Sequence, residues 1–180
     1  MFEYNIFYKE GDIQFNTCET TVLPVNCDGK MDGEVASIFR RRNPSMFERY
    51  RFFCEQRLLV PGKIWIYSTK HGKLLLLPMP EDKTVTESLQ VGLAKIVLVQ
   101  EERDIQSIAM PMVYGKNEEE TDYIKSLLTY YLCKMDIPVE IYTKHIPRSK
   151  TLIPLIERLC GSLTNKDIED IKRKLCFEID

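Results

Sequence analysis

One segment, Leu23–Ala36, constrains the fold most, because it joins a strand-like run to a helix through a polar, glycine-containing turn. The apolar Thr20–Val25 is typical of a buried strand, and Glu34–Arg42 carries apolar residues at helical spacing. In an open α/β sheet, ligands bind at the carboxyl end of a strand beside a helix N-terminus. Glycines there let the backbone approach a phosphate closely. The segment therefore predicts an α/β fold with a ligand site at this turn.

Strand-like and helix-like segments alternate along most of the chain, which predicts an α/β sandwich with a mixed sheet. The expected strands are Phe2–Tyr8, Thr20–Val25, Lys63–Ser68, Lys73–Leu77, Ser107–Met110 and Val139–Tyr142. The expected helices are Glu34–Arg42, Ser45–Gln56, Thr86–Glu102 and Glu118–Lys134. His71-Gly72 indicates a hairpin turn, and Pro24 indicates an edge or terminal position in the sheet.

The composition changes after Thr143, so we expect a main domain at 1–143 and an extension at 144–180. Lys144–Lys150 is basic and contains a proline, which is typical of a linker. Leu152–Leu159 and Lys166–Leu175 have the pattern of two short helices. Their apolar positions need a covering surface: the domain itself, which is the default, or a second copy in a homodimer, or another protein partner.

Composition and charge narrow the function classes. The chain has 180 residues, 44% of them hydrophobic, and a net charge of −2, so no global basic field favours nucleic acid. The run Arg40-Arg41-Arg42 either contacts phosphates or, as we expect, forms a solvated helix end where cations suit the dipole. Six cysteines and two histidines without paired spacing predict no metal site and no cofactor. With no leader or membrane-spanning run, we expect a reducing, cytoplasmic location.

An ordered series of short motifs resembles one known family. Gly11-Asp12-Ile13 is followed by Val22–Cys27, which resembles the family segment VNxVNC. Gly29–Ala36 resembles the loop GxMGKGIA, Leu76-Leu77-Pro78 resembles Asn-Phe-Pro, and Asp136–Tyr142 resembles the closing strand. Together these motifs resemble the macrodomains, in particular the branch of the DarG antitoxin, which removes ADP-ribose from DNA. The resemblance covers about Tyr8 to Thr143.

The resemblance implies a three-layer α/β/α fold with an ADP-ribose cleft above a mixed sheet. By carry-over, Asp12 accepts hydrogen bonds from the adenine amino group, and Ile13 offers its backbone amide. Asn26 contacts the distal ribose. The loop from Gly29 through Met31 to Gly33 wraps the diphosphate and the distal ribose. No bound cofactor is implied.

The second half of the family cleft departs from the pattern. The family loop PPLGCGNGGLDW corresponds to Pro111–Asn117, where Gly115 is the one glycine that remains. Tyr114 either stacks on a base or ribose, or is a half-buried aromatic residue. Lys116 either pairs with a phosphate as a point charge, or is a solvated turn residue. The family sequence GKG is Asp32-Gly33-Glu34 here, which brings two carboxylates close to the expected diphosphate.

The candidates for catalysis are few. The family's catalytic lysine follows its Phe-Pro motif, and Lys83 takes that place only if the loop is remodelled. Asp32 has two interpretations. Together with Asp28 and Glu34 it activates water on a ribosyl bond, or the three residues are simply acids at a helix N-terminus. We favour the second interpretation. For Cys27 we expect core packing rather than nucleophilic chemistry.

Two functions follow from these patterns. The first is a domain that binds ADP-ribose or a related nucleotide, free or on DNA or protein, with or without weak ADP-ribosyl hydrolase activity. The second is a catalytically dead macrodomain fold that serves as a protein-interaction module or takes another nucleotide-like ligand. We favour binding over catalysis, and loss of ligand in Asp12→Ala would separate the two.

Overall fold

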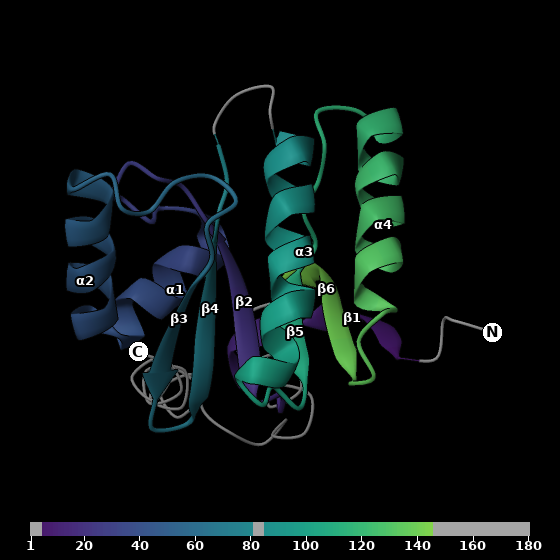
Figure 1. The fold of residues 1–180 in the computed structure, drawn as a ribbon, viewed down its shortest axis with the longest axis horizontal. Coiled ribbons are helices and arrows are strands. Elements are labelled where there is room, and N and C mark those ends of the chain that lie inside the picture. Colours follow the sequence, from purple (N-terminus) through teal and green to yellow (C-terminus); the bar gives the residue numbers. More distant parts are fainter. Residues whose placement is uncertain (1–4, 81–84, 146–180) are drawn as a thin grey trace, which may run out of the picture.

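A six-stranded mixed sheet forms the centre of the computed structural model, which describes residues 5–80 and 85–145 (Figure 1). The strand order is β1-β6-β5-β2-β4-β3. The strands are β1 Ile6–Gly11, β2 Thr20–Val25, β3 Trp65–Thr69, β4 Gly72–Pro78, β5 Ile108–Pro111 and β6 Val139–His145. All neighbouring strands pair in parallel except β3, which runs antiparallel to β4 through the predicted hairpin. The expected mixed sheet is confirmed.

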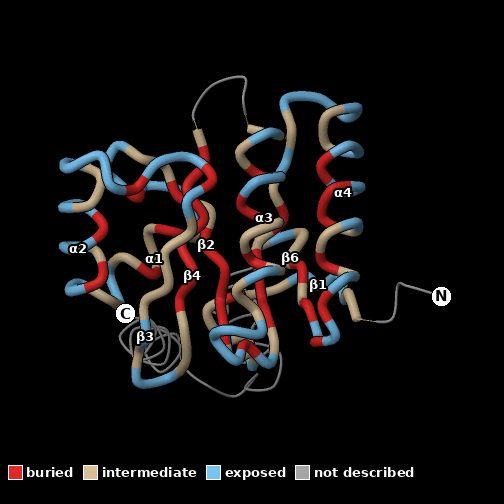
Figure 2. Tube along the Cα trace, in the orientation of Figure 1, coloured by how far each residue is buried: buried red, intermediate tan, exposed pale blue. Residues whose placement is uncertain are grey.

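Helices cover both faces of the sheet. They are α1 Glu34–Arg42, α2 Pro44–Glu55, α3 Val85–Glu102 and α4 Glu118–Leu132, and a short 3-10 turn, η1, spans Ile13–Phe15. Buried residues of α3 and α4 form one apolar core with Val22 and Leu75, whereas those of α1 and α2 form another with Leu23 and Leu76. Because neighbouring residues of a strand face opposite sides, these two cores lie on opposite faces of the sheet. The fold is therefore the predicted three-layer α/β/α sandwich (Figure 2).

Strands β2 and β4 contain runs of consecutive apolar residues, as expected for strands that are covered on both faces of the sheet. Leu74 to Leu77 on β4 are all buried, and so are five of the six residues of β2. Burying one leucine side chain contributes roughly 1.5–3 kcal/mol, so these two strands anchor both cores. Gly92 lets α3 approach β4 closely, because a Cβ there would lie 2.2 Å from Leu77 Cδ1.

One detail of the sheet differs from the expectation. Strand β1 continues through Gly11, beyond the expected end at Tyr8, and its Gly11 pairs with His145. Of the two positions expected for Pro24, the terminal one is confirmed, because β2 lies between β4 and β5 and Pro24 is near its end. The backbone of Pro24 faces the β5 side, and β5 pairs with β2 only at Thr20 and Thr21. The missing N–H of the proline therefore removes no sheet hydrogen bond.

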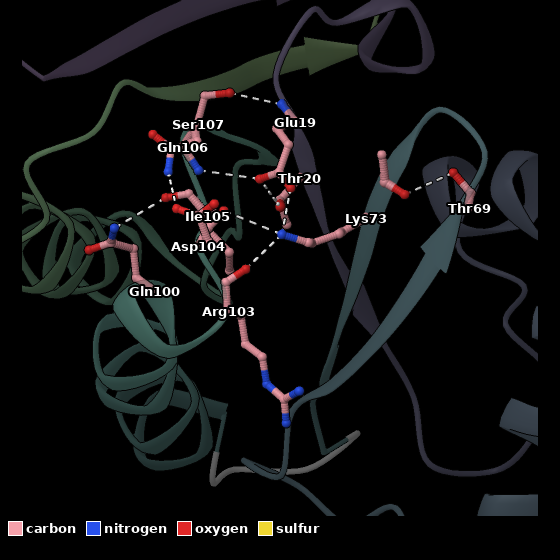
Figure 3. A network of polar contacts seen from close by, with 11 residues as sticks. Glu19, Thr20, Thr69, Lys73, Gln100, Arg103, Asp104, Ile105, Gln106 and Ser107 are labelled. Carbon is pink, nitrogen blue, oxygen red and sulfur yellow. Dashed lines mark hydrogen bonds and ion pairs between the residues drawn. The ribbon is translucent and has the colours of Figure 1, made fainter.

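A polar network at the amino end of the sheet ties the connection between α3 and β5 to the two central strands (Figure 3). Lys73 forms an ion pair with Glu19 at 2.6 Å and donates a hydrogen bond to the carbonyl oxygen of Arg103 at 2.7 Å. Glu19 also accepts from the backbone N–H of Gln106, and Ser107 accepts from the N–H of Glu19. These bonds fix the amino ends of β2, β4 and β5 relative to one another.

In residues 5–80 and 85–145, no helix combines the length and the apolar character needed to cross a membrane. The expected extension at 144–180, with its two helices at Leu152–Leu159 and Lys166–Leu175, lies outside the described residues apart from the end of β6. The division of the chain into these two parts stays a prediction.

Candidate functional site

Two adjoining hollows lie at the carboxyl end of β2, where the chain turns into α1. One hollow, of about 290 Å³, is lined by Asn26, Met31 and Asp32, with Met79 opposite. The other, of about 190 Å³, lies between the start of α1 and the segment Pro111–Val113 that follows β5. Both hollows share Pro24, Gly33 and Ala36. We call the two together the cleft.

The turn between β2 and α1 owes its shape to residues in the left-handed backbone region. Gly29 has a φ of +83°, and a Cβ at this position would lie 3.3 Å from Arg51 Cγ on α2. Met31 has a φ of +51° and its side chain is buried in the core beneath α1 and α2. The conformation of Met31 is uncommon for a residue with a Cβ, so the surrounding packing must hold it. Any contact of Met31 with a ligand in the cleft would therefore involve its backbone.

Asn26 is fixed at the mouth of the cleft by a buried tyrosine. The hydroxyl of Tyr50 on α2 lies 2.9 Å from the carbonyl oxygen of Asn26 and also contacts its side-chain Oδ1. That Oδ1 accepts from the backbone N–H of Met31 at 3.4 Å, and Nδ2 donates to Asp32 at 3.2 Å. Burial raises the pKa of Tyr50 well above its usual range, so its hydroxyl keeps its proton. Asn26 thus presents an oriented amide beside Asp32.

The three acids of the turn have different partners. Asp28 accepts from the backbone N–H of Lys30 at 2.9 Å and forms an ion pair with its ammonium group at 2.7 Å. These hydrogen bonds from Lys30 lower the pKa of the Asp28 carboxyl. Asp32 is exposed and bonded to Asn26, whereas Glu34 is exposed in the first turn of α1. Glu34 occupies the position where an acid suits the helix dipole. Asp32 as a catalytic residue stays a prediction.

The segment after β5 forms the second wall and makes its own hydrogen bonds. The N–H of Gly115 donates to the Thr121 hydroxyl at 3.0 Å, and the N–H of Lys116 donates to the Glu120 carboxylate at 2.6 Å. Tyr114 is 58% exposed, and its hydroxyl donates to the carbonyl oxygen of Thr143. The first turn of α4 therefore satisfies the backbone donors that a diphosphate would use in a glycine-rich loop.

Asp12 and Ile13 follow β1 at the same end of the sheet, and they line neither hollow. The Asp12 side chain caps η1, accepting from the Gln14 backbone N–H at 3.2 Å and from Gln14 Nε2 at 3.0 Å. Ile13 is buried against the core of α1 and α2. Of the expected ligand residues, the structure brings together Asn26, Met31 and Gly33. The other expected ligand residues line neither hollow: Asp12, Ile13, Gly29, Tyr114, Gly115 and Lys116.

Sequence reasoning missed two parts of the site. Tyr50, which holds Asn26, is four residues after Met46, and both are buried on α2. This spacing marks the inner face of a helix, so the sequence signalled burial but not the contact. Met112 and Val113, which line the cleft, continue an apolar segment after Pro111. Lys83 lies outside the described residues, and within residues 5–80 and 85–145 no group of three His, Cys, Asp or Glu residues is arranged to hold a metal ion.

Curated relatives share part of this chain. The DNA ADP-ribosyl glycohydrolases of Mycobacterium bovis and Mycobacterium tuberculosis are each 30% identical over 113 residues, which is 59% of this chain and 32% of each relative. A DNA ADP-ribosyl transferase–DNA ADP-ribosyl glycohydrolase fusion protein of Thermosipho africanus is 28% identical over 169 residues, 79% of this chain and 44% of the relative. The chain thus spans less than half the length of these relatives. No family model matches it.

Solved structures of macrodomains are also similar to the fold of this chain. The macrodomain of Thermus aquaticus DarG aligns with a TM-score of 0.69 at 22% identity, covering 77% of this chain and 97% of the other. The macrodomain of Mycobacterium tuberculosis DarG gives 0.66 at 25% identity, covering 76% and 96%. Thermosipho africanus DarTG, solved in complex with ADP-ribose, gives 0.69 at 27% identity, covering 77% and 41%. This chain is a divergent macrodomain of the DarG type.

The expected family and fold class of this macrodomain are thereby confirmed. The DarG macrodomains align along nearly their whole length with about three quarters of this chain. The roles of individual residues in the macrodomain cleft stay predictions, because no ligand contact in this chain tests them.

Proposed function

We propose that this macrodomain binds ADP-ribose in the cleft at the carboxyl ends of β2 and β5. The observation that carries the proposal is the prebuilt turn at Asn26–Gly33, which opens onto two adjoining hollows at the start of α1. A helix N-terminus beside a hollow is a favourable place for a diphosphate, because unpaired backbone N–H groups and the helix dipole both attract anions. Thermosipho africanus DarTG, solved in complex with ADP-ribose, supports this choice of ligand.

In this proposal each part of the ligand meets a different element. The diphosphate lies over Gly33, where both hollows meet and no side chain intrudes. The distal ribose lies against the oriented amide of Asn26, and the adenine lies toward Asp12 and Ile13. The exposed carboxylate of Asp32 accepts hydrogen bonds from ribose hydroxyls rather than facing the phosphates.

The segment after β5, which forms the second wall of the cleft, favours binding over rapid turnover, because its backbone donors are already used. The N–H groups of Gly115 and Lys116 are satisfied by side chains of α4. A transition state that develops charge needs donors that are free and already oriented. We therefore propose a reader of ADP-ribose groups as the main function, with Lys83 and Asp32 as the residues to test for slow hydrolysis. ADP-ribosylated DNA is the first substrate to assay, because the curated relatives are named DNA ADP-ribosyl glycohydrolases.

Calorimetric titration with ADP-ribose tests the proposal. The wild-type chain is compared with Asp12→Ala, with Asp12→Asn, which keeps an oxygen for the η1 cap, and with the control Asp122→Ala on the exposed face of α4. We expect micromolar binding that is lost in Asp12→Ala, weakened about tenfold in Asp12→Asn and unchanged in the control. Absence of binding by the folded wild-type chain would overturn the proposal and favour a protein-interaction role.

A second assay addresses catalysis separately. Release of ADP-ribose from a modified single-stranded oligonucleotide is followed for the wild-type chain, Lys83→Ala and Asp32→Ala. Tight binding without release identifies a reader. Release that Lys83→Ala abolishes, with binding unchanged, identifies a hydrolase.

A further inference from the structure

A second pocket lies away from the cleft, near the amino end of the sheet on the side of α1 and α2. It has a volume of about 970 Å³, several times that of either hollow of the cleft. Three segments distant in sequence line it: the segment between β1 and β2, which we call the strap, the corner between α1 and α2, and the hairpin of β3 and β4. We call it the basic pocket.

The charged lining of the basic pocket is mostly cationic. The cations come from two separate elements: Arg41 and Arg42 at the end of α1, and Lys70 and Lys73 on the hairpin. Among the described lining residues, Glu19 is the one carboxylate, and it is paired with Lys73 (Figure 3). Arg41, Arg42 and Lys70 therefore face the pocket without a compensating acid in its lining. The dipole of α1 accounts for cations at its last turn, but it does not explain cations on the hairpin opposite.

The walls also carry groups that suit the rest of a nucleotide. Gln14 lines the pocket, and its side-chain Nε2 donates to the Asp12 carboxylate at 3.0 Å, which fixes the side chain. Half-buried Tyr67 also lines the pocket, and an aromatic ring is a surface on which a base can stack. Arg42 lies 5.6 Å from the centre of the Phe15 ring, which holds its guanidinium beside the strap.

We propose that the basic pocket is a second nucleotide site, which takes a phosphate on Arg41 and Arg42 and a base against Tyr67. Its volume lies at the upper end of the range for small-molecule sites, so one nucleotide fits with room to spare. The nucleotide is either free or part of a single strand of nucleic acid, and the chemistry of recognition is the same. This site does not depend on ADP-ribose binding in the cleft.

The test measures two probes on the full chain: AMP by calorimetry, and a short fluorescein-labelled oligothymidylate by anisotropy at several salt concentrations. The variants are Arg41→Gln with Arg42→Gln, and the neutral change Tyr67→Leu, which removes the ring. Arg49→Gln with Lys63→Gln is the matched control, because it removes the same charge at exposed positions outside the pocket. Gly33→Val, which fills the cleft, separates binding at the two sites. Melting temperatures establish that each variant is folded.

We expect the double arginine variant to weaken binding about tenfold, Tyr67→Leu about fivefold, and both controls less than about twofold. For the oligothymidylate, loss of two phosphate contacts lowers the salt slope by about 1.4. AMP and oligothymidylate of equal affinity indicate a free nucleotide, whereas tighter, more salt-dependent oligothymidylate binding indicates a strand. Equal binding by the double variant and its matched control overturns the proposal. Loss of binding in Gly33→Val, or wild-type binding in Tyr67→Leu, does so too.

Discussion

Tyr50 and Asn26 are joined by their side chains although 24 residues separate them. The fully buried tyrosine hydroxyl contacts both oxygens of the asparagine, and this bond sets the direction of the amide at the mouth of the cleft. Helix α2, which touches no ligand in our proposal, thus positions a residue that does.

Tyr50→Phe removes the donor to Asn26 and keeps the ring. Because a buried acceptor loses its partner, we expect the free energy of unfolding to fall by about 1–2 kcal/mol. ADP-ribose binding weakens as well, since Asn26 is no longer held. Thermal melting and calorimetry measure the two effects. Tyr130→Phe, on the exposed face of α4, is the matched control and leaves both unchanged. If Tyr50→Phe binds ADP-ribose as tightly as the wild type, Tyr50 does not position Asn26 for binding.

Gly33 and Gly29 differ in what a Cβ would meet. At Gly33 the nearest contact is Ala36 Cβ at 3.8 Å and φ is −55°, so Gly33→Ala fits the fold and narrows the cleft. At Gly29, φ is +83°, so Gly29→Ala is strained by about 1–2 kcal/mol. We expect Gly33→Ala to lose ADP-ribose affinity at an unchanged melting temperature, and Gly29→Ala to melt earlier. If Gly33→Ala binds like the wild type, the diphosphate does not lie over Gly33.

Gly115 is the remaining glycine of the second wall, and its role is steric. A Cβ there would lie 2.6 Å from Glu120 Cβ and 2.8 Å from the Glu120 carbonyl carbon. Gly115→Ala therefore displaces the start of α4, where Asn117 caps the helix, and costs about 1–3 kcal/mol. Urea unfolding followed by circular dichroism measures this loss. A variant as stable as the wild type would show that the segment after β5 can shift freely.

The ion pair of Glu19 and Lys73 makes stability depend on pH. Partial burial acts to raise the pKa of Glu19, but hydrogen bonds from Lys73 and from the Gln106 N–H lower it overall. A lowered carboxyl pKa contributes stability above its unfolded value, and that contribution is lost as pH falls through the folded pKa. Glu19→Gln should melt earlier than the wild type near pH 7, and the difference should shrink toward about pH 3. A difference independent of pH would contradict this linkage.

Cys27 follows Asn26 directly, yet it is unsuited to nucleophilic chemistry. Burial raises the pKa of its thiol to about 11, so the thiolate fraction near neutral pH is roughly a hundredfold lower than usual. We expect slow alkylation of Cys27 by iodoacetamide in the folded protein and normal alkylation in denaturant, measured by peptide mass spectrometry. ADP-ribose binding should survive in Cys27→Ser. Rapid labelling of the folded chain would reverse this view.

Local patterns predicted the elements of this fold because apolar runs and breakers stand out in the sequence. Thr20–Val25 was found to the residue, and the hairpin at His71-Gly72 is confirmed. The interior position of Pro24 could not be predicted, because it depends on where pairing with β5 stops. Likewise, no spacing rule brings Tyr50 to Asn26, or Arg41 and the hairpin lysines around one pocket. Those contacts arise from the packing of whole elements.

Two side chains that hold the turn after β2, those of Met31 and Tyr50, are buried in the core beneath it. The backbone of the turn therefore depends more on this buried support than on the acids of its exposed face. Residues on that face, such as Asp32 and Glu34, can be exchanged without rebuilding the loop beneath them. The ligand preference of this domain can therefore be re-engineered by substitutions on the exposed face, while the backbone of the turn is retained.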